Sequence, residues 1–161
     1  MMTQPRGILA CIEVNAAVDQ VWAAWTTAQG IQQFFAPQCH VGYDVGAPYE
    51  ILFDLDAPEG EQGSEGAIIL ALDEPHMLSF TWNAPPSLPD IRRQRTLVTI
   101  QLSQVNSHTT EVSLYHTGWG VSEQWDQAFH YFDYAWKKVV LPRLKYALEV
   151  NAIDWANPPA L

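Results

Sequence analysis

The feature that most constrains this chain is a long helical pattern near its C-terminal end. Its apolar residues recur every three or four positions: Trp125, Phe129, Phe132, Trp136, Val140, Leu144 and Leu148. This spacing predicts an amphipathic helix of about six turns. Ser122 is its expected N-cap, and Pro142 should bend it, because proline lacks an amide proton and clashes with the carbonyl of Lys138. A helix with such an apolar face must be buried against another layer.

The residues before this helix predict that the other layer is an antiparallel sheet. Residues 8–14 alternate as a strand does, and Val18, Val21, Trp22 and Trp25 then share one helical face. Gly30 interrupts that helix, and a second short helix is expected around residues 31–35. Six further strands are predicted at residues 39–45, 48–55, 65–72, 76–82, 95–104 and 109–117. The expected class is therefore α+β, with a sheet covered on its apolar face by the long helix.

Composition restricts the kind of protein this can be. The chain has 161 residues, 12% of them aromatic and only 16% charged, which excludes a disordered protein. We expect one domain over residues 1–161, with a core at 8–149 and a tail at 150–161. The longest apolar run, residues 67–72, is too short to cross a membrane, so no membrane insertion is expected. Nothing before Ile8 resembles a signal peptide, and the expected location is the cytoplasm.

The distribution of charge excludes one class of partner. Between Gly7 and Ile91 there are twelve acidic residues and no lysine or arginine, and the formal net charge is −10. Most of the surface would repel a polyanion, so nucleic-acid binding is not expected. The two cysteines, Cys11 and Cys39, have neither CxxC spacing nor neighbouring Cys/His pairs, which indicates buried strand residues rather than zinc ligands.

Several segments resemble one known family. They include 21–26 (VWAAWT), 46–49 (GAPY), 65–68 (EGAI), 78–82 (LSFTW), 98–102 (VTIQL), 110–119 (TEVSLYHTGW) and 141–145 (LPRLK). Together they resemble the START/birch-pollen-allergen (SRPBCC) superfamily, and within it the family named for the activator of the ninety-kilodalton heat-shock-protein ATPase. The family often has Gly-Gly where this chain has Gly46-Ala47 before Pro48. Proline cannot donate to a strand ladder, so Pro48 should lie at a strand start or edge.

The resemblance implies a helix-grip fold. In such a fold a curved antiparallel sheet of about seven strands wraps around the C-terminal helix, two short helices follow the first strand, and an elongated cavity lies between sheet and helix. The same apolar side chains could pack as an ordinary core or line a ligand-binding cavity. The sequence alone does not distinguish these two possibilities. The candidate ligand-binding residues are Phe80, Trp82, Ile100, Val112, Leu114, His116, Trp119, Trp125, Phe129, Phe132 and Trp136.

His116 is the polar candidate within this set. It shares a strand face with Val112 and Leu114, so its ring should be enclosed. It could act as an acid or base, or be a structural histidine bonded to a carbonyl or an indole. No catalytic triad, P-loop, dinucleotide motif or metal-binding spacing is found, and no metal or cofactor is expected.

Three functions remain open at this stage. The first is non-catalytic binding of a small, largely apolar molecule in the cavity. The second is a co-chaperone-like modulation of a heat-shock chaperone ATPase, with a chaperone as partner. The third is an enzyme acting on a hydrophobic substrate through His116, although the absence of catalytic motifs favours a binding protein. The chain could be a monomer or a homodimer.

The proline-rich segment 83–90 is the remaining candidate for a functional element. Three prolines, Pro85, Pro86 and Pro89, predict a stiff connection without helix. Such a loop could be an ordinary surface connection. Alternatively, it could form the rim of the cavity mouth with Leu88 pointing inward, flanked by Trp82 and by Trp119 with Gly120.

Overall fold

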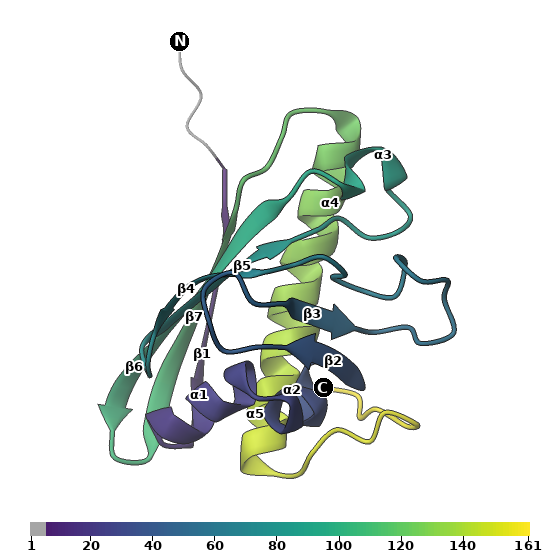
Figure 1. Ribbon diagram of the computed structural model, residues 1–161. Helices are drawn as coiled ribbons and strands as arrows, with labels where there is room; N and C mark the ends of the chain where they lie inside the picture. Colours follow the sequence, from purple (N-terminus) through teal and green to yellow (C-terminus); the bar gives the residue numbers. More distant parts are fainter. Residues whose placement is uncertain (1–5) are drawn as a thin grey trace.

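In the computed structural model, which describes residues 6–161, the chain has the predicted order of strand, two helices, further strands and a long final helix (Figure 1). The expectation about a signal peptide concerns residues 1–5 and lies outside this range. The elements are β1 (Ile8–Val14), α1 (Val18–Thr26), α2 (Ala28–Phe34), β2 (Gln38–Val41), β3 (Tyr49–Leu52), β4 (Ile69–Asp73), β5 (Met77–Trp82), α3 (Pro89–Arg92), β6 (Thr96–Asn106), β7 (Thr109–Thr117), α4 (Glu123–Tyr134), η1 (Ala135–Val140) and α5 (Leu141–Glu149).

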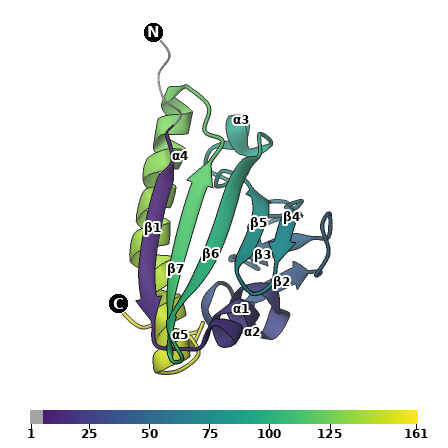
Figure 2. The same cartoon turned by 90° about the vertical axis from the view of Figure 1, so that its left-hand side faces the viewer.

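The main sheet is antiparallel throughout, with five strands in the order β1-β7-β6-β5-β4 (Figure 2). The remaining two, β2 and β3, pair with each other as a separate ribbon. An isolated bridge between Pro48 and Ile68 joins that ribbon to the region of β4, and Gly46 N–H also donates to the carbonyl of Ile69. Pro48 directly precedes β3, as expected for a residue that cannot donate to the ladder. The α+β helix-grip fold is confirmed, with its seven strands divided between two sheets.

The long helix begins where the sequence predicts and contains an unexpected segment. Ser122 caps it, because its Oγ accepts a hydrogen bond from the backbone N–H of Trp125 at 3.2 Å. Between α4 and α5 the chain forms the π-helix η1, in which Leu141 N–H bonds to the carbonyl of Trp136. Pro142 then falls in the first turn of α5, where a missing amide proton is tolerated. The structure therefore accommodates the proline with a wider turn ahead of it.

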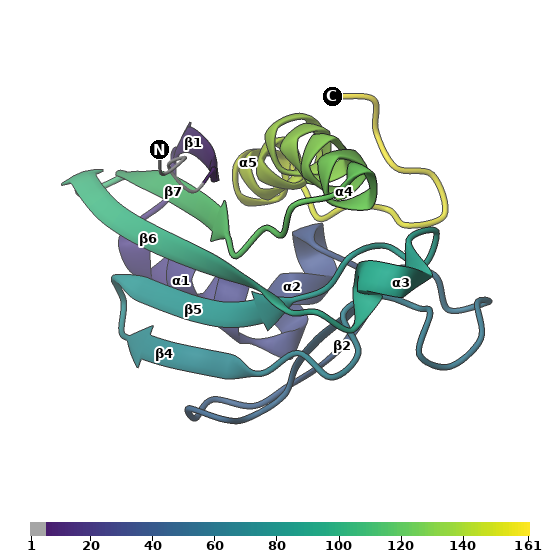
Figure 3. The ribbon, with the colours of Figure 1, turned by 90° about the horizontal axis from the view of Figure 1, so that it is seen from above.

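The core lies between the curved sheet and the helices (Figure 3). The predicted inner face of β7 is confirmed, since Thr110, Val112, Leu114 and His116 are all completely buried. Alternate residues of β6, including Val98 and Ile100, face the same core.

Two local predictions were wrong. The break between α1 and α2 falls at Thr27, whose side chain accepts from Gly30 N–H at 3.0 Å, and Gly30 itself lies within α2. Gly30 is instead required for close helix packing, because a Cβ there would lie 2.2 Å from the carbonyl oxygen of Ala23. Cys11 is exposed rather than buried, because it lies on the outer face of the edge strand β1.

The described residues include neither a helix fit to span a membrane nor a cluster of metal-binding side chains. Over residues 6–161, no helix has both the length and the apolar character that crossing a membrane requires. In the same range, no group of three or more His, Cys, Asp or Glu side chains is placed to hold a metal ion.

Candidate ligand-binding cleft

A cleft of about 550 Å³ lies along α4, η1 and the start of α5. The helix contributes one wall. Phe35 at the end of α2, Phe53 after β3 and Trp82 at the end of β5 contribute the facing wall. The full lining is Phe35, Phe53, Trp82, Tyr131, Phe132, Tyr134, Ala135, Trp136, Val139, Val140 and Arg143.

The facing aromatic rings make the floor of the cleft rigid. The ring of Trp82 lies 5.5 Å from that of Trp136 and 5.8 Å from that of Phe35, measured between centroids. Phe35 and Trp136 also meet edge to face at 5.9 Å. These rings are largely buried by packing on one another, and their remaining exposed parts form one apolar wall of the cleft.

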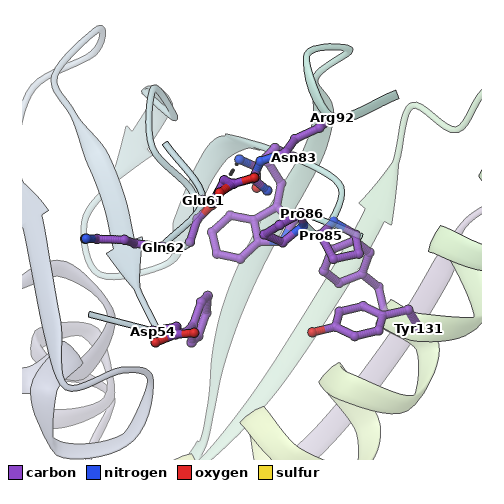
Figure 4. Close-up of a pocket in the computed structure, with 12 residues that line it drawn as sticks. Asp54, Glu61, Gln62, Asn83, Pro85, Pro86, Arg92 and Tyr131 are labelled. Atoms are coloured by element: carbon purple, nitrogen blue, oxygen red, sulfur yellow. Dashed lines mark hydrogen bonds between the residues drawn. The ribbon is translucent and has the colours of Figure 1, made fainter. Parts of the chain in front are cut away.

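A smaller cavity of about 230 Å³ continues the cleft and shares Phe53, Trp82, Tyr131 and Phe132 with it. Its remaining lining is mostly polar or proline: Asp54, Glu61, Gln62, Gly63, Asn83, Pro85, Pro86 and Arg92. Figure 4 shows Tyr131 reaching in from the helix, with Asp54 on the opposite side and Arg92 at the far rim. One end of the combined cleft is therefore apolar and aromatic, and the other is polar with two carboxylates.

Arg92 holds this polar end together. Its guanidinium donates to the backbone carbonyls of Gly60, Gly63 and Ala84, which joins the loop after β3 to the proline-rich segment. The carboxylate of Glu65 accepts from the backbone N–H groups of Gly60, Gln62 and Gly63 in the same loop. Burial raises the pKa of Glu65, but these hydrogen bonds outweigh it, so the net pKa lies below its usual value. The loop is thus a fixed wall.

His116 lies behind the cleft floor and is completely buried. The indole Nε1–H of Trp136 donates to His116 Nδ1 at 3.0 Å, and His116 Nε2 lies 2.8 Å from Thr96 Oγ1. An indole nitrogen can only donate, so Nδ1 must be the acceptor and Nε2 carries the proton. Burial lowers the pKa of His116 to about 3, and the ring is therefore neutral at physiological pH. Both ring nitrogens are occupied by bonds that fix Trp136 and Thr96.

The structure brings three of the predicted site residues into the cleft: Trp82, Phe132 and Trp136. Four others, namely Phe80, Ile100, Val112 and Leu114, are buried in the main core beneath it. Trp119 covers His116, with ring centroids 4.3 Å apart, and contacts the partly buried Phe129 at 5.2 Å. Trp125 belongs to a second, smaller core cluster with Ala84, Leu88, Ile91 and Ala128.

Sequence analysis missed most of the polar and peripheral lining. The sequence predicts a short helix at Phe35 and a strand at Phe53, but it carries no signal that both side chains face the long helix. Tyr131, Tyr134 and Val139 fall beside the apolar stripe of that helix, which is the one pattern that could have indicated them.

The proline-rich segment differs from its expected role as a rim. Pro85 and Pro86 do line the smaller cavity. Leu88, however, is turned away from the cleft and packs in the second cluster with Trp125. Residues from Pro89 to Arg92 form the short helix α3, because a proline is well placed in a first helical turn.

Comparison with known structures supports the same architecture. A protein from Mesorhizobium loti matches with a TM-score of 0.71 and 19% identity, covering 89% of this chain and 97% of its own. The Aha1 dimer from Colwellia psychrerythraea matches with a TM-score of 0.67 and 20% identity, covering 90% and 97%. An HSP90 activator from Plasmodium falciparum matches with a TM-score of 0.68 and 15% identity, covering 88% and 95%. These TM-scores show a shared fold.

The sequence comparisons give the family. No curated protein sequence matches this chain at a significant level. A family model described as "Activator of Hsp90 ATPase homolog 1-like protein" matches residues 15–149, which includes every helix and strand except β1. The chain therefore belongs to the family of Activator of Hsp90 ATPase homolog 1-like proteins, within the SRPBCC superfamily.

Proposed function

We propose that this protein binds a small, largely apolar molecule in the cleft between the sheet and the C-terminal helix. The observation that carries the proposal is the cleft itself, about 550 Å³ of space walled by the rings of Phe35, Phe53, Trp82, Phe132 and Trp136. Transfer of an apolar molecule from water to such a surface is favourable in proportion to the apolar area that it buries.

The alternative of catalysis by His116 lacks geometric support. A general acid or base must reach its substrate within hydrogen-bond distance and change its protonation state near the working pH. The His116 ring is completely buried, its Nδ1 is bonded to Trp136 and its Nε2 to Thr96. The low pKa also keeps it neutral, so its geometry fits a structural histidine.

Filling the cleft should weaken binding. Ala135 lies on η1 and lines the cleft, so Ala135→Phe places a ring where the ligand would lie. With Nile red, a neutral apolar dye, we expect fluorescence titration to show a dissociation constant about tenfold higher, or ~1.4 kcal/mol of lost binding free energy. Val105→Phe is the matched control, because Val105 lies exposed on β6 outside the cleft.

The outcomes of this experiment are clear. Weaker binding to Ala135→Phe with unchanged binding to Val105→Phe supports the cleft as the site. Equal binding to both variants and to the unmodified chain would place the dye elsewhere and contradict the proposal. Circular dichroism of each variant checks that the fold is retained.

A chaperone-related function is the second candidate, and family membership favours it. The Plasmodium falciparum relative, an HSP90 activator, has the same fold as this chain. Here the test is the rate of ATP hydrolysis by a purified ninety-kilodalton heat-shock chaperone with and without this protein. A rate unchanged across a range of added protein would argue against this candidate.

A further inference from the structure

Arg143 is the charged residue that lines the larger, apolar part of the cleft. It lies in the first turns of α5, beyond Val139 and Val140. The other side chains around this part are aromatic or aliphatic. Arg143 is partly buried, and the apolar side chains around it leave the five N–H donors of its guanidinium without a protein acceptor.

No anion in the described part of the chain neutralises Arg143. Within residues 6–161 its guanidinium forms no ion pair within 4 Å and no hydrogen bond. The other described cations without a partner, Arg93 and Lys138, are exposed to solvent, whereas Arg143 is partly buried. Its burial is also reflected in a pKa lowered from the usual arginine value. Arg92 at the other end of the cleft differs, because backbone carbonyls occupy its guanidinium.

The C-terminal tail holds Arg143 in place without neutralising it. The guanidinium carbon lies 5.4 Å from the centre of the Trp155 ring. Trp155 is itself anchored, since its Nε1–H donates to the carbonyl of Gln32 at 2.7 Å, and Ile153 N–H donates to that of Gln33. The tail is thus docked on α2 beside the cleft, and it orders the arginine while leaving its polar edge available.

The two ends of the combined cleft have opposite electrostatic character. Asp54, Glu61 and Arg92 line the smaller cavity, where backbone carbonyls occupy the Arg92 guanidinium. Arg143 lines the larger one. A negative group would be repelled at the first end and attracted at the second, and the attraction is stronger where apolar walls exclude water. Two lysines on the long helix are already paired, Lys137 with Asp133 and Lys145 with Glu149. The third, Lys138, is exposed and does not line the cleft.

We propose that the cleft binds an apolar monocarboxylate, with its carboxylate on the guanidinium of Arg143 and its apolar body against the aromatic rings of the cleft. This inference rests on the proposed function and adds the ligand class and its orientation. Arginine is suited to the role, because its planar fork can donate two parallel hydrogen bonds to a carboxylate. The body then extends along η1 and α4 toward Phe53 and Trp82.

The test compares two displacing molecules that differ only in their head groups. Decanoate and decanol are titrated against the Nile red complex at pH 8, where decanoate is ionised. For the unmodified chain we expect decanoate to displace the dye at a concentration about tenfold lower than decanol does, as one charge-assisted hydrogen-bonded contact predicts. Arg143→Met keeps an apolar side chain of similar length against Trp155 and should abolish this preference, so that decanoate no longer displaces the dye at a lower concentration than decanol does.

Arg93→Met is the matched control, because it makes the same change in net charge at an exposed position outside the cleft lining. It should retain the tenfold preference for decanoate. Equal displacement by decanoate and decanol from the unmodified chain, or a preference that survives in Arg143→Met, would overturn the carboxylate proposal and leave cleft binding standing. If neither molecule displaces Nile red, the proposed function fails and this inference fails with it.

Discussion

Replacing Trp136 by alanine is expected to lower the free energy of unfolding by about 5 kcal/mol, the largest effect of any single substitution considered. The side chain is 1% exposed and packs on Phe35, Trp82 and Phe132. Truncation leaves a cavity in the cleft floor, and it also removes the donor to His116 Nδ1. A buried acceptor left without a donor adds its own cost of desolvation.

Urea denaturation measures this effect. A cost of this size lowers the urea midpoint by about 2 M or more, because the slope is typically 1–3 kcal/mol per molar. Trp136→Phe keeps most of the packing but removes the hydrogen bond to His116, so about 1–3 kcal/mol is expected. Tyr134→Ala, an exposed change on the same helix, is the control and should cost no more than about 0.5 kcal/mol. If Trp136→Phe proved as stable as the unmodified protein, the bond to His116 would contribute nothing.

The second large effect is a loss of stability on acidification that depends on His116. Its pKa is about 3 in the folded protein, lowered by burial from the ordinary histidine value of 6.5. Between these values the unfolded chain binds a proton at His116 and the folded chain does not, so acid favours unfolding. This contribution to stability is complete above pH 6.5 and is lost progressively as the pH falls toward 3, by about 1.4 kcal/mol per pH unit.

The matched variant is His116→Gln, which retains polar atoms next to Trp136 and Thr96 and does not titrate. Free energies of unfolding for both proteins are measured from pH 8 to pH 4. Other groups titrate in both proteins, so the difference between the two curves isolates the contribution of His116. Between pH 8 and pH 4 the unmodified protein should lose about 3 kcal/mol more of its free energy of unfolding than the variant does. Parallel curves would contradict the assignment. Nitrogen chemical shifts of the imidazole provide an independent measurement, since His116 should remain in its neutral Nε2–H form at pH 5.

The periodic parts of the fold were predictable from the sequence. Strand β1 begins and ends where the alternation of apolar residues predicts. In β7 the even-numbered residues are the buried ones, as their pattern predicts. Ser122 caps the long helix, as the sequence predicts, because it is a short polar residue that directly precedes the apolar repeat. These features depend on residues within a few positions of one another, and local spacing is what a sequence displays directly.

Departures from the predicted fold occur where distant segments meet. Packing between elements decides three of these features. They are the π-helical segment η1, the close approach of Gly30 to the backbone of Ala23, and the separation of the β2–β3 ribbon from the main sheet. For the same reason Leu88 packs with Trp125 rather than into the cleft. Secondary-structure propensity and apolar periodicity describe one element at a time, so they carry no information on the contacts between elements.

The candidate site shows this division most clearly. Apolar periodicity determined that Trp82, Phe132 and Trp136 would face inward, and the motifs determined the helix-grip fold and the family. Only the tertiary structure decided that the helix and the sheet leave an open cleft, that His116 is engaged on both nitrogens, and that Trp155 holds an unneutralised Arg143 at one end. The physical reason is that inward direction is a local property of a strand or helix. A cavity and the charge that lines it arise from the fit of side chains that lie far apart in the chain.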